Sequence, residues 1–106
     1  MSDVIDIIAE PTRREILRLV WNEELSAGEV AAHFQQTQPA ISQHLRVLRE
    51  AELVSVRPDG ARRLYRARPE ALGALKPYME ALWRDGLRRM KREVENEIRR
   101  KAGDDG

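Results

Sequence analysis

The chain has 106 residues, of which 42% are hydrophobic, and its formal charge is +1. This size and composition suit one compact domain over residues 1–106 that buries a small core. The absence of cysteine excludes a disulfide framework and any metal site built from thiolates. No basic segment followed by an apolar run opens the chain, and no stretch of about 18 apolar residues occurs, so we expect a cytoplasmic protein with no membrane partner.

Positive charge is concentrated in the middle of the chain. Residues 1–24 contain three arginines and six acidic residues, a net charge of −3, whereas residues 37–68 contain seven arginines and three acidic residues, a net charge of +4. Arginine also outnumbers lysine, and its planar guanidinium suits phosphates and base edges. The distribution therefore predicts that a polyanion binds the middle of the chain.

Three helices are predicted before residue 36. The first could be capped by Ser2, and Pro11 fits the first turn of the second, where a proline removes no intrahelical hydrogen bond. Ser26 and Glu29 have the spacing of a capping box, which predicts a short third helix over about residues 27–34. The apolar residues that define the first two helices are Val4, Ile5, Ile8, Ile16, Leu17, Val20 and Trp21.

A fourth helix is predicted over about residues 38–51. Thr37 can cap this helix, and Pro39 lies in its first turn. On a helical wheel one face is apolar, formed by Ile41, Leu45 and Leu48. The opposite face and its margin carry Gln38, Pro39, Ser42, Gln43, Arg46 and Arg49. One face is therefore expected in the core and the other is free to bind.

A basic β-hairpin is predicted over about residues 54–67. After Leu53 the apolar period changes to two, and Asp59–Gly60 separates the two alternating runs, as is typical of a hairpin turn. The arginines of this segment are Arg57, Arg62, Arg63, Arg66 and Arg68. A basic hairpin can bind phosphates, but charge can also serve only to keep an edge strand soluble.

The C-terminal part is predicted to be one long helix over about residues 77–100, which Pro77 separates from a short lead-in, with a frayed tail "AGDDG". Apolar residues recur along the helix at alternating spacings of four and three. A helix of about 24 residues is about 36 Å long. Because it outreaches so small a core, its apolar stripe predicts pairing with a second copy of the chain, although an intramolecular core is the alternative.

Four segments together resemble the ArsR-type winged-helix repressors of bacteria and archaea. These segments are "EPTRREILRLV", "LSAGEVAAHF", "TQPAISQHLRVLREAELV" and "DGARRLYR", within residues 9–68. The resemblance implies a mainly α fold with a small β-hairpin, a winged helix-turn-helix, that dimerises through its terminal helices. It also implies homodimeric binding to operator DNA, which many members release on binding a metal or another ligand.

Metal-sensing members of that family place cysteines before the recognition helix, or Asp and His ligands along the last helix. Here the first region reads "LSAGEVAAHF" and the last helix has no histidine. The chain is therefore similar to the subset without a recognisable metal site. We expect no cofactor and no metal, and whether any effector controls the protein is left open.

These patterns predict a sequence-specific DNA-binding regulator, most simply a homodimeric repressor of a pseudo-palindromic operator, with autoregulation left open. The predicted DNA-contacting residues are Thr37, Gln38, Pro39, Ser42, Gln43, His44, Arg46, Arg57, Arg62 and Arg63. The predicted dimer interface consists of Val4, Ile5, Ile8, Met79, Leu82, Trp83, Gly86, Leu87, Met90 and Val94.

Three alternatives stay open at this stage. The polar helix face could be merely solvated, and His44, at the border of the two faces, could be a packed histidine. The whole chain could instead be an interaction module that docks a partner protein, with DNA binding secondary. An enzyme is not expected, since the sequence has no phosphate-binding glycine loop, no H-x-x-x-H pair and no nucleophile elbow.

Overall fold

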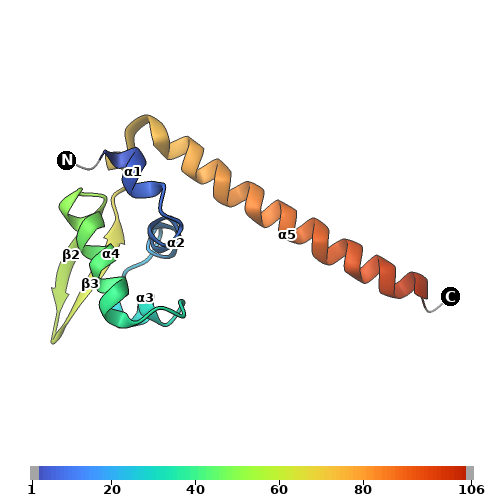
Figure 1. Ribbon diagram of the computed structural model, residues 1–106, viewed down its shortest axis with the longest axis horizontal. Coiled ribbons are helices and arrows are strands. Elements are labelled where there is room, and N and C mark those ends of the chain that lie inside the picture. Colours follow the sequence, from blue (N-terminus) through green and yellow to red (C-terminus); the bar gives the residue numbers. More distant parts are fainter. Residues whose placement is uncertain (1–2, 105–106) are drawn as a thin grey trace. The chain divides into compact units, whose positions relative to one another are not determined.

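The computed structural model describes residues 3–104, apart from the side chains of Leu87 and Asp104. The first part of the chain forms α1 (Val4–Ile8), α2 (Pro11–Leu19), β1 (Leu25–Ser26), α3 (Ala27–Ala31) and α4 (Gln38–Glu50). It continues with β2 (Val54–Asp59), β3 (Arg62–Ala67), the 3₁₀ segment η1 (Pro69–Leu75) and α5 (Lys76–Asp104), as Figure 1 shows.

The chain divides into two compact units, Met1–Gly73 and Ala74–Gly106, which are described separately. The expectation of one domain over residues 1–106 therefore stays a prediction. Among the described helices, none is both long and apolar enough to cross a membrane.

Local signals in the sequence start the helices of the first unit. Pro11 is the first residue of α2, and the side chain of Glu10, which we did not predict as a cap, accepts a hydrogen bond from the Arg13 N–H at 3.1 Å. The predicted capping box of α3 is confirmed: the Glu29 N–H donates to Ser26 Oγ (3.2 Å) and the Ser26 N–H donates to Glu29 Oε1 (3.0 Å). The predicted cap Ser2 lies outside the described residues.

The third helix is shorter than the sequence predicted. It ends at Ala31 rather than near Phe34. The N–H groups of His33 and Phe34 donate to the carbonyls of Val30 and Ala31, three residues back, so the chain tightens into turns instead of continuing the α-helical pattern.

The apolar face of α4 forms the centre of the first unit. Ile41, Leu45 and Leu48 are each at most 1% exposed, as the wheel predicted, and α4 packs against α2, α3 and β2. Ile16 of α2 and Val30 of α3 are fully buried in the same core. The position of α4 is therefore fixed on three sides.

The predicted hairpin is part of a three-stranded antiparallel sheet in the order β1-β3-β2. Strand β1, which has only two residues and pairs Leu25 with Tyr65, was not predicted from the sequence. In the hairpin, Asp59 pairs with Arg62, so the loop consists of Gly60 and Ala61. Gly60 has a φ of +63°, the left-handed region that glycine adopts without steric cost.

The connection from α4 to β2 is a Schellman motif without glycine. The Leu53 N–H donates to the carbonyl of Leu48 and the Glu52 N–H donates to the carbonyl of Arg49, both at 2.9 Å. Glu52 has a φ of +62°, which a residue with a Cβ adopts only with strain. This turn sets the direction in which the hairpin leaves the helix.

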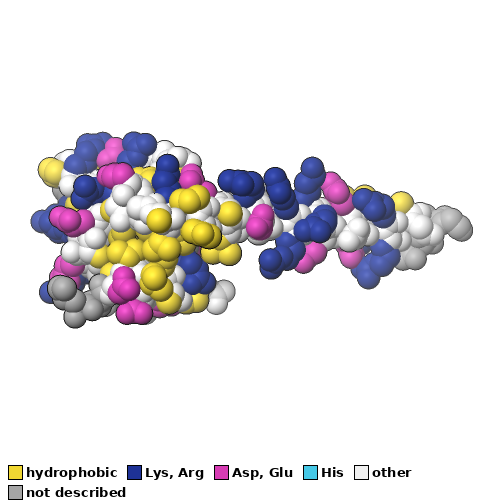
Figure 2. Space-filling view, turned by 90° about the horizontal axis from the view of Figure 1, so that it is seen from above, with side chains coloured by type: hydrophobic (Ala, Val, Ile, Leu, Met, Phe, Trp, Pro, Cys, Tyr) yellow, Lys and Arg dark blue, Asp and Glu magenta, His cyan; other side chains and the backbone are white. Residues whose placement is uncertain are grey.

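The second unit is dominated by α5, a helix of 29 residues and therefore about 44 Å long. It begins after η1, as Pro77 suggested, but it runs to Asp104 instead of fraying after about residue 100. Several apolar side chains of its stripe are largely exposed in the single chain: Leu82 (51%), Met90 (56%), Val94 (52%) and Ile98 (62%). Figure 2 shows a face of α5 on which Lys and Arg side chains predominate.

We predict that Glu52→Gly stabilises the protein by about 0.5–1 kcal/mol, because glycine removes the left-handed strain at an exposed position. Glu52→Ala is the matched control, since it removes the carboxylate but keeps the Cβ. Thermal unfolding of both variants checks this. An equal gain in both would show that the carboxylate, and not the backbone conformation, is the source of instability.

Candidate nucleic-acid interface

The polar face of α4 is open to solvent over its whole length. Its exposed members are Gln38, Pro39, Ser42, Gln43, Arg46 and Arg49, together with the capping residue Thr37. These residues share one helix whose opposite face is buried, so their backbone positions are rigid. The set predicted from the wheel is thus brought together on one surface, while its contact with DNA stays a prediction.

The start of α4 is fixed by two polar contacts. Thr37 Oγ1 accepts a hydrogen bond from the Ala40 N–H at 3.3 Å, which confirms it as the cap. In the preceding turn, the side-chain amide of Gln36 donates to Thr12 Oγ1 of α2 at 2.8 Å. The turn that precedes α4 is therefore hydrogen-bonded to α2, and this contact fixes the position of the first residues of α4.

Arg46 of this face is held by only one weak ion pair. Its Nε lies 3.4 Å from Glu50 Oε1, and both side chains are 70% exposed. An exposed pair at this spacing contributes only about 0.3–0.5 kcal/mol to stability, so a base or a phosphate can replace Glu50 as the partner of Arg46. Arg49 forms no ion pair among residues 3–104.

His44 lies between α4 and the N-terminal helices. Its Nδ1 accepts a hydrogen bond from Arg13 Nε at 3.2 Å and lies 3.8 Å from Glu10 Oε2. Arg13 also donates to the carbonyl of Ile7, so the contact joins α1, α2 and α4. These contacts favour the packed histidine over the DNA contact as the role of His44.

The arginines of the hairpin lie on two different faces. The register pairs Arg57 with Leu64, Asp59 with Arg62, and Pro58 with Arg63. Because side chains alternate along a strand, Arg57, Asp59 and Arg62 share one face, and Arg63 lies on the other. The two neighbouring arginines are therefore not equivalent, although the sequence analysis grouped them.

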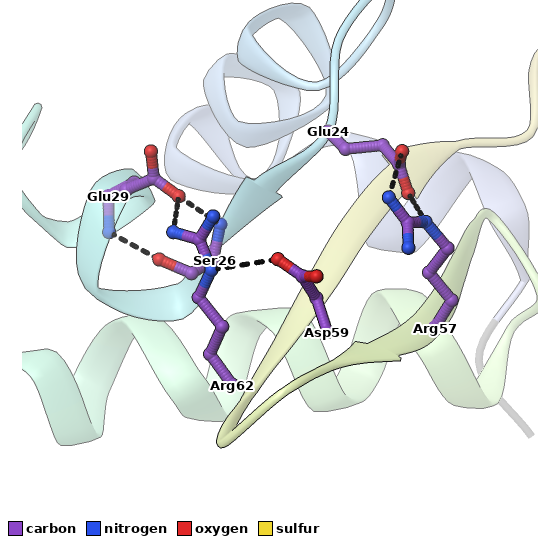
Figure 3. A network of polar contacts seen from close by, with 6 residues as sticks. All are labelled: Glu24, Ser26, Glu29, Arg57, Asp59 and Arg62. Carbon is purple, nitrogen blue, oxygen red and sulfur yellow. Dashed lines mark hydrogen bonds and ion pairs between the residues drawn. The ribbon is translucent and has the colours of Figure 1, made fainter.

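Arg57 is held by a carboxylate that the sequence analysis did not consider. It donates from Nε to Glu24 Oε2 at 2.6 Å and from Nη2 to Glu24 Oε1 at 3.0 Å, as Figure 3 shows. Glu24 directly precedes β1, and Arg57 lies on β2. Since β3 lies between these strands, the ion pair spans the sheet.

Arg62 has two acidic partners. Its Nη1 donates to Glu29 Oε1 and its Nε donates to Asp59 Oδ2, each at 3.2 Å (Figure 3). The first contact joins the tip of the hairpin to the first turn of α3. Arg63, by contrast, is exposed and has no ion pair within the described part of the chain.

The two glutamates are stabilised in their charged forms. Hydrogen bonds from Arg57, aided by its charge and that of Arg66, hold the pKa of Glu24 below its usual range. Hydrogen bonds from the backbone and side chain of Ser26, with the charge of Arg62, lower the pKa of Glu29. The hydrogen bonds with Glu24 in turn raise the pKa of Arg57. Both carboxylates are therefore ionised at neutral pH.

Comparison with known proteins identifies the fold's family. The model of the "Bacterial regulatory protein, arsR family" matches residues 10–56. HTH-type transcriptional regulator Rv2034 of Mycobacterium tuberculosis (strain ATCC 25618 / H37Rv) is 40% identical over 80 residues, which cover 76% of this chain and 75% of that protein. This chain belongs to the arsR family.

Two further relatives support the same assignment. Transcriptional repressor SdpR of Bacillus subtilis (strain 168) is 44% identical over 55 residues, which cover 52% of this chain and 61% of SdpR. A solved structure described as a possible transcriptional regulator for arsenical resistance has a TM-score of 0.67 and 42% identity, and the match covers 88% of this chain and 97% of that one. This arsR-family chain is thus a winged-helix transcriptional regulator and not an enzyme.

The reference to arsenical resistance belongs to that neighbour and is not carried over to this chain. Within residues 3–104, no three His, Asp or Glu side chains lie together in an arrangement that could hold a metal ion. The acidic side chains nearest the hairpin are engaged by Arg57 and Arg62 instead.

We predict that the acid sensitivity of this arsR-family protein depends on Glu24. A carboxylate whose pKa is lowered by folding stabilises the fold above its ordinary value of 4.5, and this contribution is lost as the pH falls through the lowered pKa. Acidification from about pH 6 to pH 3 should therefore lower the melting temperature less in Glu24→Gln than in the wild type. Glu23→Gln, at an exposed neighbour that has no ion pair with any described residue, should follow the wild type. Equal acid sensitivity in all three proteins would contradict the prediction.

Proposed function

We propose that the protein is a homodimeric repressor whose two α4 helices enter successive major grooves of a pseudo-palindromic operator. The observation that carries this proposal is the exposed polar face of α4 above a fully buried apolar face. Half-sites one helical turn apart would place the two recognition helices about 34–36 Å from each other. Covering a promoter, including that of its own gene, would then block transcription.

The side chains on α4 suit base edges in the major groove. Gln38 and Gln43 can each pair with adenine through the donor and acceptor of the amide, and Arg46 can pair with guanine. Ser42, between them, can reach a base edge or a phosphate. An exposed arginine of the hairpin, on strand β3, would contact the backbone beside the groove.

The partner we propose for α5 is a second copy of the chain. Leu82, Met90, Val94 and Ile98 recur at helical spacing and are about half exposed in the single chain, which is costly in water. Self-pairing of a helix stripe buries the same residues from both copies. Because the basic side chains visible in Figure 2 occupy another part of the surface of α5, they would stay solvated in such a pair.

The predicted interface residues differ in their exposure. Ile5, Leu82, Gly86, Met90 and Val94 are exposed, whereas Val4 and Trp83 are partly buried. Ile8 (9%) and Met79 (4%) are already buried within one chain, so they would support the interface from beneath rather than contact a partner. The side chain of Leu87 lies outside the described residues.

We expect Gln43→Ala to lower affinity for the operator by about 1–3 kcal/mol and to change affinity for random DNA much less. Gel shifts on the upstream region of the gene and on random duplex, over a salt series, measure both. An equal loss on the two duplexes would refute a base-reading role for Gln43. If the wild type binds neither duplex at low salt, the interaction-module alternative is favoured instead.

Charge placed in the stripe of α5 should separate the dimer. Met90→Asp and Val94→Asp are each expected to give a monomer in light scattering at concentrations where the wild type is dimeric, because a carboxylate at the centre of an apolar contact is desolvated. Arg92→Asp introduces the same side chain outside the stripe and should stay dimeric. A dimer that survives all three substitutions would place the interface elsewhere.

A further inference from the structure

The hairpin carries exposed arginines in two distinct states. Arg57 and Arg62 are engaged by three carboxylates at 2.6–3.2 Å, whereas Arg63 is exposed without an acidic partner in the described chain. Arg66 also has no ion pair with the described residues, but it lies close enough to Glu24 to lower the pKa of that carboxyl. Charge available to a polyanion therefore differs along the hairpin.

Arg57 would have to leave the carboxylate of Glu24 in order to bind a DNA phosphate, and this exchange is unfavourable. If its guanidinium turned to DNA, Glu24 would be left as an unpaired anion on the same face of the sheet, facing the approaching phosphates. The contact that would be lost is bidentate, a geometry stronger than that of ordinary surface pairs.

The carboxylates join parts that the backbone connects only indirectly. Glu24 and Arg57 link the segment before β1 to β2 across β3, and Glu29 and Arg62 link the first turn of α3 to the tip of the hairpin. Glu29 is itself fixed by the capping box with Ser26. The hairpin is thereby held to α3, which packs against the recognition helix α4.

We propose that Glu24 and Glu29 are positioning residues that hold the hairpin through Arg57 and Arg62, and that Arg63 is the hairpin arginine that contacts a DNA phosphate. This proposal rests on the proposed function, since it concerns how the hairpin meets operator DNA. The geometry assigns one basic contact per hairpin, on the face opposite the ion pairs. The paired arginines set its position and cancel nearby negative charge.

Neighbouring arginines provide the matched test. Arg63→Gln removes one phosphate contact from each subunit, so the slope of log affinity against log salt should flatten by about 0.9 per contact, or about 1.8 for the dimer. Arg62→Gln makes the same charge change one residue away. It should leave the slope nearly unchanged and lower the preference for operator over random DNA, because the hairpin loses its contact with α3. Equal flattening in both variants would overturn the proposal.

Release of Arg57 gives a second test. Glu24→Ala should free the guanidinium of Arg57 for phosphates. Affinity for random duplex should then rise, and the slope of log affinity against log salt should steepen by about 0.9 per subunit. Glu23→Ala removes the same charge from the adjacent exposed position and controls for net charge. If Glu23→Ala raises affinity and slope as much as Glu24→Ala, the effect is one of net charge and Glu24 does not restrain Arg57.

A spectroscopic measurement separates this proposal from the proposed function. In the free protein, the Nε–H of Arg57 should exchange slowly with solvent and that of Arg63 rapidly, with the signals assigned through Arg57→Gln and Arg63→Gln. Added operator duplex should protect Arg63 and leave Arg57 unchanged. Rapid exchange of Arg57 in the free protein overturns the positioning role even if DNA binds. Slow exchange without any DNA binding instead counts against operator recognition and against Arg63 as a phosphate contact.

Discussion

Burial of one face of α4 is the constraint on which the other features depend. Ile41, Leu45 and Leu48 are nearly inaccessible, and removing any one of them would leave a cavity costing about 2–5 kcal/mol. Because these three side chains fix the rotation of the helix, they also determine which residues face outward. The apolar contacts thus select the surface that we propose meets DNA, although the three residues themselves are buried.

Electrostatic contacts within the chain decide how much of its positive charge is available. By sequence, the acids of residues 1–24 and the arginines of residues 37–68 form blocks of opposite sign. In the fold, Glu24 of the first block neutralises Arg57 of the second. Glu29 likewise engages Arg62. The net charge of a segment therefore overstates its attraction for a polyanion wherever the fold brings carboxylates into contact with its arginines.

Signals between nearby residues were sufficient to predict most of the helices and the hairpin. The capping box at Ser26, the proline in the first turn of α4 and the glycine at the hairpin loop each act within a few residues. Strand β1 has no such signal, because its two residues become a strand only where β3 supplies hydrogen bonds. Two of the ion pairs in Figure 3, Glu24–Arg57 and Glu29–Arg62, could not be predicted from the sequence either, because the partners are 33 residues apart in each pair.

Arg62 and Arg63 show why two neighbouring residues of the same type can have different roles in a strand. On a helix, adjacent residues are about 100° apart and can border the same surface, but in a strand they point to opposite faces. Two arginines in succession on a hairpin therefore cannot bind one phosphate surface equally. One of them, Arg62, meets carboxylates of its own chain, and in our proposal the same contact keeps it from DNA and orients the other. In this hairpin, a side chain that does not touch the ligand can matter as much for recognition as one that does.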